Sequence, residues 1–129
     1  MQGSGQAGFS LLGVLIAVMI MGIVATIAVP RFNGAIATAN TAKIEADLST
    51  LDSAIIVYEA EHGVPPSDLK MLDGYVNDVD KLAPPKGKCL LKEGGETAIS
   101  GTAYQIKAGT GIAEHRATLD GHTLGEFGK

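Results

Sequence analysis

Charged side chains are absent from the first thirty residues of this 129-residue chain, although ten basic and fourteen acidic residues follow. From Phe9 to Val29 the residues are apolar or small, and the interruptions are Ser10, Gly13, Gly22 and Thr26. A helix of this length spans roughly 30 Å, which is the thickness of the hydrocarbon core of a bilayer. The missing charge therefore predicts a membrane-spanning helix over residues 9–30.

Two alternatives to a membrane helix stay open. One is a buried helix of a soluble protein, although such a helix seldom runs past about 20 residues without a polar face. The other is a cleaved secretory signal, because AIA at Ala35 to Ala37 fits a small-residue cleavage site. The lack of basic residues before the apolar run, and the length of that run, both disfavour a signal.

Cysteine is scarce and tryptophan is missing. A single cysteine, Cys89, excludes an intrachain disulfide, and a lone thiol is most often a small core residue. The formal net charge is −4, so no basic excess indicates nucleic-acid binding. We therefore predict neither a disulfide framework nor a nucleic-acid partner.

An apolar helical stripe follows Pro30. Its members recur at spacings of three and four residues and are Ile44, Leu48, Leu51, Ile55 and Tyr58. The charged residues around the stripe are expected to form a solvated face, and they are Lys43, Glu45, Asp47, Asp52 and Glu59. Gly63 and the two prolines after it stop the helix. The pattern thus predicts one long helix from Phe9 to about His62, with a weak point at Pro30.

The last half of the chain predicts a small antiparallel sheet. Residues 63–101 are expected to be a loop region that contains a short helix in SDLKMLDG, with Ser67 as its cap and Gly74 at its end. The same region is expected to hold a short strand in KCLLK and an exposed loop in EGGETAISG. Strands in TAYQIKA, IAEHRATL and HTLGEF would form the sheet over residues 102–127. Candidates to pack on the stripe are Tyr104, Ile106, Leu119 and Leu124. The expected fold class is α+β, with one long N-terminal helix packed on a small C-terminal antiparallel sheet.

No group of residues predicts catalysis or metal binding. Gly3, Gly5 and Gly8 satisfy the G-x-G-x-x-G pattern, but no strand precedes them and an apolar helix follows. The histidines stand apart from one another and from any nucleophile; they are His62, His115 and His122. The C-terminal carboxylates are scattered over several segments; they are Glu93, Glu96, Asp120 and Glu126. We therefore predict no enzymatic activity, no cofactor and no metal.

The N-terminal half resembles the type IV pilins and the pseudopilins of type II secretion. Gly8 followed by FSLL is similar to the site cut by prepilin peptidase, and Gly22 and Pro30 stand where pilin helices carry their glycine and proline. IAVPRF is similar to the end of a pilin membrane segment, and residues 41–72 resemble the following helix and loop of major pseudopilins. The resemblance implies a leader over 1–8, a membrane and filament-core helix over 9–30, and a pilin-like globular domain over 31–129. It also implies N-methylation of Phe9 after the cut.

The function that this resemblance implies is that of a filament subunit. Its partners would be further copies of the chain in a helical filament, prepilin peptidase, an assembly platform and other pilins or pseudopilins. The chain would cross the inner membrane once, with the C-terminal domain outside the cytoplasm, before it enters a periplasmic or surface filament. Close helix packing is suggested by two small-xxx-small pairs on opposite faces, Gly13 with Ala17 and Gly22 with Thr26.

Two departures from the family pattern keep other interpretations open. Gly13 stands where most members carry a glutamate that is thought to pair with the N-terminal amine of a neighbouring subunit, and the leader lacks basic residues. A minor or tip subunit that initiates the filament is one alternative. A single-pass anchored binding module that never polymerises is another. One such architecture serves secretion, adhesion, motility and DNA uptake alike.

Overall fold

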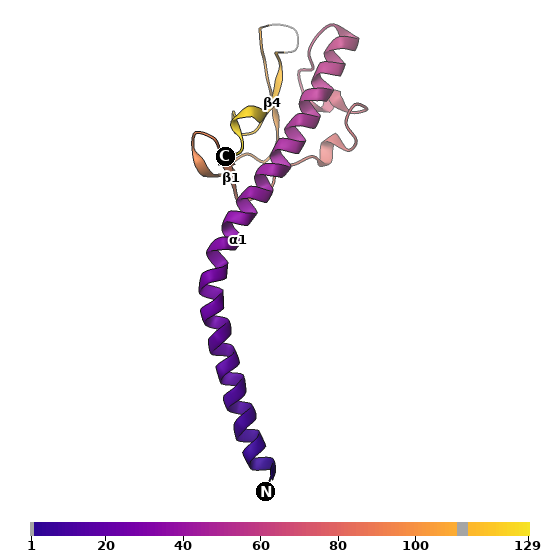
Figure 1. The fold of residues 1–129 in the computed structure, drawn as a ribbon. Helices are drawn as coiled ribbons and strands as arrows, with labels where there is room; N and C mark the ends of the chain where they lie inside the picture. Colours follow the sequence, from indigo (N-terminus) through magenta and orange to yellow (C-terminus); the bar gives the residue numbers. More distant parts are fainter. Residues whose placement is uncertain (1, 111–113) are drawn as a thin grey trace. The chain divides into compact units, whose positions relative to one another are not determined.

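The computed structural model describes the backbone of residues 2–110 and 114–129, and the side chains from Ser10 onward within those ranges (Figure 1). The chain divides between Ala35 and Ile36 into two compact units. The first unit is helical over its described residues, and the second contains the rest of that helix and the strands. The division falls a little after Pro30, where the sequence predicted the start of the globular part.

A single helix, α1 (Gln2–His62), runs through the first unit and into the second. Pro30 lies inside α1, so the missing N–H of this proline does not end the helix. The helix stops at Gly63, which adopts a φ of +74° and donates its N–H to the Glu59 carbonyl at 2.8 Å. The prediction of one long helix that ends near His62 is confirmed.

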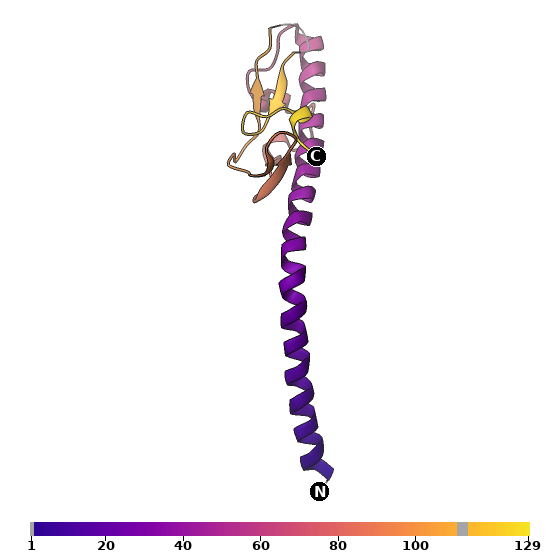
Figure 2. The same cartoon turned by 60° about the vertical axis from the view of Figure 1, so that its left-hand side comes forward.

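Two small antiparallel sheets follow α1 in the second unit. Strand β1 (Lys88–Leu91) pairs with β2 (Gly95–Ala98), and β3 (Gln105–Lys107) pairs with β4 (Arg116–Thr118). Both sheets lie along one side of the C-terminal half of α1 (Figures 1 and 2). The predicted α+β class is confirmed, with two sheets of two strands in place of one larger sheet.

The segment EGGETAISG is not wholly a loop, because it contains β2. Gly95 adopts a φ of +63°, and this left-handed conformation lets the chain turn back onto β1. The four residues of β2 are mostly exposed, so their sequence lacks the alternating apolar pattern that marks a half-buried strand. The strand expected in KCLLK is confirmed as β1.

The prediction of a third strand in HTLGEF is wrong, because this segment forms a short 3-10 helix, η3 (Leu124–Glu126). Thr123 and Glu126 form a capping box, in which the Thr123 N–H donates to the Glu126 carboxylate at 2.6 Å. This local closure turns the chain where a third strand would have to extend. Phe127 then bridges to Leu91, which connects the C-terminal residues to β1.

Two further 3-10 helices lie between α1 and β1. The first, η1 (Leu69–Leu72), is capped by Asp68, whose carboxylate accepts from the Lys70 N–H at 3.4 Å. The expectation of Ser67 as the cap is wrong, since the Ser67 hydroxyl donates to a methionine sulfur instead. The second, η2 (Val79–Lys81), lies in a segment expected to be loop.

One apolar core fills the space between the C-terminal half of α1 and the sheets. The five residues of the stripe are buried in this core, and they are Ile44, Leu48, Leu51, Ile55 and Tyr58. Tyr104 and Leu119 are buried against them, while Ile106 and Leu124 are partly buried. Cys89 also lies in the core, as a lone apolar thiol is expected to do.

Candidate functional site

The most unusual surface of the chain is the apolar segment of α1. From Leu11 to Val29 the large apolar side chains are each between 47% and 68% exposed. The helix is long and apolar enough to cross a membrane, by its length and composition. Burial of such side chains is worth about 1.5–3 kcal/mol each. A surface of this kind therefore requires lipid or other protein around it.

The five predicted packing positions lie along this segment. Gly13, Ala17, Gly22, Thr26 and Pro30 are all exposed in the single chain. A Cβ atom at Gly13 or at Gly22 would meet nothing within 4 Å, so neither glycine serves a contact within the chain. The Thr26 hydroxyl donates to the Ile23 carbonyl at 2.7 Å, which satisfies its donor in an apolar environment. Their role in packing stays a prediction.

The predicted cleavage site lies in the first turns of α1. The backbone of Gly8 and Phe9 belongs to the helix, and the Phe9 side chain falls outside the described ones. Cleavage after Gly8 and methylation of Phe9 therefore stay predictions that depend on the sequence pattern.

Polar side chains of α1 attach the globular part to the helix. Asp47 accepts a hydrogen bond from the Tyr104 hydroxyl at 2.6 Å, and Asp52 accepts one from the Ala117 N–H at 2.7 Å. Glu59 is 7% exposed. The expectation that all these carboxylates form a solvated face is therefore wrong for these three, because they flank the stripe closely enough to be covered by the same packing.

Burial and hydrogen bonding shift the pKa of Asp52 and the pKa of Tyr104. Burial raises the pKa of Asp52 above its ordinary value, and the Ala117 N–H and the Arg116 charge oppose that shift in part. Burial also raises the pKa of Tyr104, and the hydrogen bond to Asp47 raises it further. Asp52 thus carries a partly desolvated charge, and Tyr104 stays a neutral donor.

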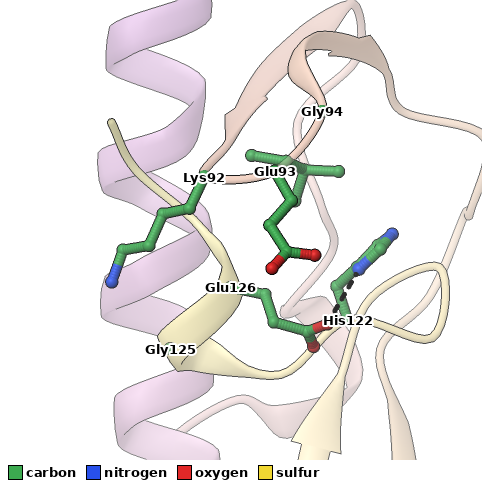
Figure 3. A pocket seen from close by; sticks show the side chains of 7 residues that line it. Lys92, Glu93, Gly94, His122, Gly125 and Glu126 are labelled. Carbon is green, nitrogen blue, oxygen red and sulfur yellow. Dashed lines mark hydrogen bonds and ion pairs between the residues drawn. The ribbon is translucent and has the colours of Figure 1, made fainter.

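A hollow of about 350 Å³ lies beside η3 (Figure 3). Its polar walls include Glu93, His122 and Glu126, and the His122 ring lies 3.4 Å from the Glu126 carboxylate. The pKa of Glu126 is lowered, first by the Thr123 N–H and then by His122. Glu126 is therefore occupied in its own capping box. Within the described residues, no three His, Cys, Asp or Glu side chains come close enough to hold a metal ion.

Comparison with known proteins found a family motif at the N-terminus and relatives that match more than half of the chain. The family described as "Prokaryotic N-terminal methylation motif" matches residues 3–29. "Type II secretion system core protein G" of Aeromonas hydrophila is 34% identical over 77 residues, which are 60% of this chain and 54% of that protein. "Competence protein ComGC" of Halalkalibacterium halodurans is 33% identical over 97 residues, which are 74% of this chain and 92% of that protein.

The length of the match differs between relatives. The chain spans about half of the Aeromonas protein. It spans 65% of the core protein G of Klebsiella michiganensis, to which it is 28% identical over 94 residues. No solved structure matches the chain.

A helical segment with a methylation motif, followed by a small α+β unit, defines a protein of the prepilin class. The match to the competence protein covers 92% of that protein, so it indicates the family more specifically than the N-terminal motif does. The chain belongs to the family of type IV pilins and type II secretion pseudopilins.

Proposed function

We propose that this chain is a structural subunit of a type IV pilus or a type II secretion pseudopilus. Prepilin peptidase would cut it after Gly8 and methylate Phe9, and residues 9–30 would hold it in the membrane until assembly. The C-terminal domain would lie outside the cytoplasm. In the filament, the apolar segments of many copies would bundle as the core. No enzymatic activity is part of this proposal, and none of the relatives above is named as an enzyme.

The observation that carries this proposal is the exposed, uncharged segment of α1 that lies within and just after the methylation motif. Lipid can cover such a surface in storage, and other copies of the same segment can cover it in a filament. Apolar burial is therefore retained in both states, so transfer between them does not require the segment to enter water. The small residues at Gly13, Ala17, Gly22 and Thr26 would allow close approach on two faces of the helix, and Pro30 would loosen the helix near its exit.

Gly13 favours a second candidate function, that of a minor or tip subunit. A carboxylate in the membrane costs roughly 2.5–3.5 kcal/mol on insertion scales, so it persists where a partner compensates. A subunit at the tip has no neighbour above it that could supply an amine. A glycine at this position avoids the cost, and it also gives up the pairing.

A test of assembly separates the filament subunit from an anchored module. The chain would be expressed in full with its secretion or pilus machinery, and sheared filaments would be separated from membranes. A filament subunit is expected in the sheared fraction, and Gly8→Arg, which should not be cut, is expected to stay in the membrane. Recovery of the unaltered chain from membranes alone would contradict the proposal and favour the anchored binding module.

A further inference from the structure

Basic and acidic residues are strongly segregated along this chain. The segments 31–44 and 81–92 together hold six of the ten basic residues and none of the fourteen acidic residues. The remainder of the chain consequently has four basic and fourteen acidic residues. The formal net charge of −4 conceals this polarity.

The fold brings parts of these two segments together at one end of the second unit. The Asn40 side-chain amide donates to the Lys86 carbonyl at 3.1 Å and to the Lys88 carbonyl at 2.9 Å. One residue further along α1, the Thr41 hydroxyl accepts from the Leu90 N–H at 2.7 Å. The start of β1 is thereby fixed beside the first turns of α1 in the second unit. We call Lys43, Lys86 and Lys88 the basic surface.

The lysines of the basic surface are available to a partner. Lys86 is exposed and makes no ion pair with the described residues. Lys88 lies 3.3 Å from Glu96, and the two side chains are 61% and 41% exposed. An exposed pair of this kind is worth about 1 kcal/mol or less, so an external anion can compete for Lys88. The Lys43 side chain is 49% exposed and pairs with Asp47, whose own side chain is 13% exposed.

The remaining lysines of segment 81–92 are left out of this surface. Lys81 lies in η2, outside the stretch that Asn40 and Thr41 hold against α1. Lys92 follows the other end of β1, where its N–H donates to the Glu126 carbonyl at 3.0 Å.

Chain connectivity keeps the basic surface close to the apolar segment. Asn40 follows Arg31, the first charged residue, by nine positions on the continuous helix α1. Nine helical residues span about 14 Å, and this limit holds whatever the angle between the two units. A lysine side chain adds several ångströms of reach, and the electrostatic screening length is about 8–10 Å. With residues 9–30 in a bilayer, the basic surface would lie within range of the lipid headgroups.

We propose that Lys86 and Lys88, supported by Lys43, bind anionic phospholipid headgroups while the chain is stored in the membrane. This inference rests on the proposed membrane storage of the apolar segment. The acidic remainder of the second unit is repelled by the same surface, so the unit docks with β1 toward the bilayer. Each lysine near an anionic membrane shifts the ratio of docked to undocked molecules roughly fivefold. Extraction into a filament then has to break these contacts.

The test uses the full chain in lipid nanodiscs that contain a trace of lipid with a gadolinium-chelating headgroup. Amide relaxation of residues 86–92 is measured by NMR in phosphatidylcholine discs and in discs with about one third phosphatidylglycerol. We expect relaxation at least about twofold faster with phosphatidylglycerol, and loss of the difference near 1 M salt, where the screening length is about 3 Å. We expect the same loss in Lys86→Gln/Lys88→Gln.

The matched control is Lys70→Gln/Lys107→Gln, which removes two exposed lysines outside the basic surface. This variant should keep the effect of phosphatidylglycerol, and unchanged amide shifts of the core residues Leu51 and Ile55 would show that each variant is folded. Equal relaxation in both kinds of disc, or an effect that survives in Lys86→Gln/Lys88→Gln, would overturn the inference. Shift changes that depend on the number of chains per disc and not on lipid charge would assign the surface to a second copy instead. A chain that does not enter discs at all would overturn membrane storage as well.

Discussion

Asp52 on α1 accepts a hydrogen bond from the backbone N–H of Ala117 on β4 at 2.7 Å, across 65 residues of sequence. Ala117 is fully buried, so this N–H has no access to water if the carboxylate is removed. The pair therefore fixes β4 to the helix within the second unit. It also places a carboxylate where burial raises its pKa.

Asp52→Ala should lower the free energy of unfolding by about 1–3 kcal/mol, because it leaves the Ala117 N–H buried and unpaired. Asp52→Asn keeps an acceptor oxygen of the same shape and should be clearly less harmful. Urea unfolding of a fragment from Arg31 to Lys129 would measure both. Equal losses in the two variants would show that the oxygen is not the reason for the effect.

The pH dependence of stability should follow from the same carboxylate. The pKa of Asp52 is higher in the folded state than its ordinary 3.8, so the folded state holds the proton more tightly. The contribution of Asp52 to stability is therefore greatest below pH 3.8 and is lost as the pH rises through the folded-state pKa. Asp52→Asn should gain stability relative to the unaltered fragment between acidic and neutral pH. A difference that is constant over this range would contradict the assignment.

Tyr104→Phe should destabilise the same fragment by about 1.5–3 kcal/mol, because it removes a buried hydroxyl that donates to a charged carboxylate. Tyr75→Phe is the matched control, since Tyr75 donates to Glu61 at the surface. The pKa of Tyr104 is raised above its ordinary 10.0, so its stabilising effect should be full below pH 10 and decline as the pH rises from there through the raised pKa. The hydrogen bond to Glu61 raises the pKa of Tyr75 as well, so thermal melting of both variants at neutral pH is the comparison that separates the buried hydroxyl from the exposed one.

Leu51→Ala should cost about 2–5 kcal/mol, because Leu51 has no exposed surface and its truncation leaves a cavity between α1 and the sheets. Ile56 on the same helix is 43% exposed, and Ile56→Ala should cost about 0.5 kcal/mol or less. Denaturant unfolding of both variants compares the two faces of the helix directly. A small loss for Leu51→Ala would mean that the stripe does not hold the sheets.

The sequence predicted the helix and its buried face because burial repeats with the helical period, and Leu48, Leu51 and Ile55 follow that period. It did not predict β2, whose short and exposed residues have no apolar alternation. The capping box of Thr123 and Glu126 was readable in the sequence as T-x-x-E and would have argued against a third strand.

The roles of Asp47 and Asp52 were not predictable from local pattern. Their partners lie 57 and 65 residues away, so only the packed fold shows which flank of the stripe is covered. The apolar segment, by contrast, was predicted from the sequence as a membrane and filament-core helix, because its composition and its motif are local features. The structure adds that its side chains are exposed in the single chain.

Gly13→Glu should distinguish a general subunit from a tip subunit. The new carboxylate would lie about one helical turn from Phe9, where the amine of a neighbouring subunit could pair with it. A general subunit is expected to enter sheared filaments at least as well as before, because assembly would compensate the cost of the charge in the membrane. Reduced incorporation would favour the tip subunit. Leu12→Glu, which places the charge on another face of the helix, is the control for a general effect of charge.

The identity of the mature N-terminal residue tests the central claim most directly. Mass spectrometry of the chain from cells with an active prepilin peptidase should find N-methylated Phe9 as the first residue, and the Gly8→Arg variant should keep residues 1–8. A mature chain that begins at Met1 would identify an ordinary membrane anchor. One that begins at Thr38 would identify a cleaved secretory signal, and either result would contradict the account of this chain as a filament subunit.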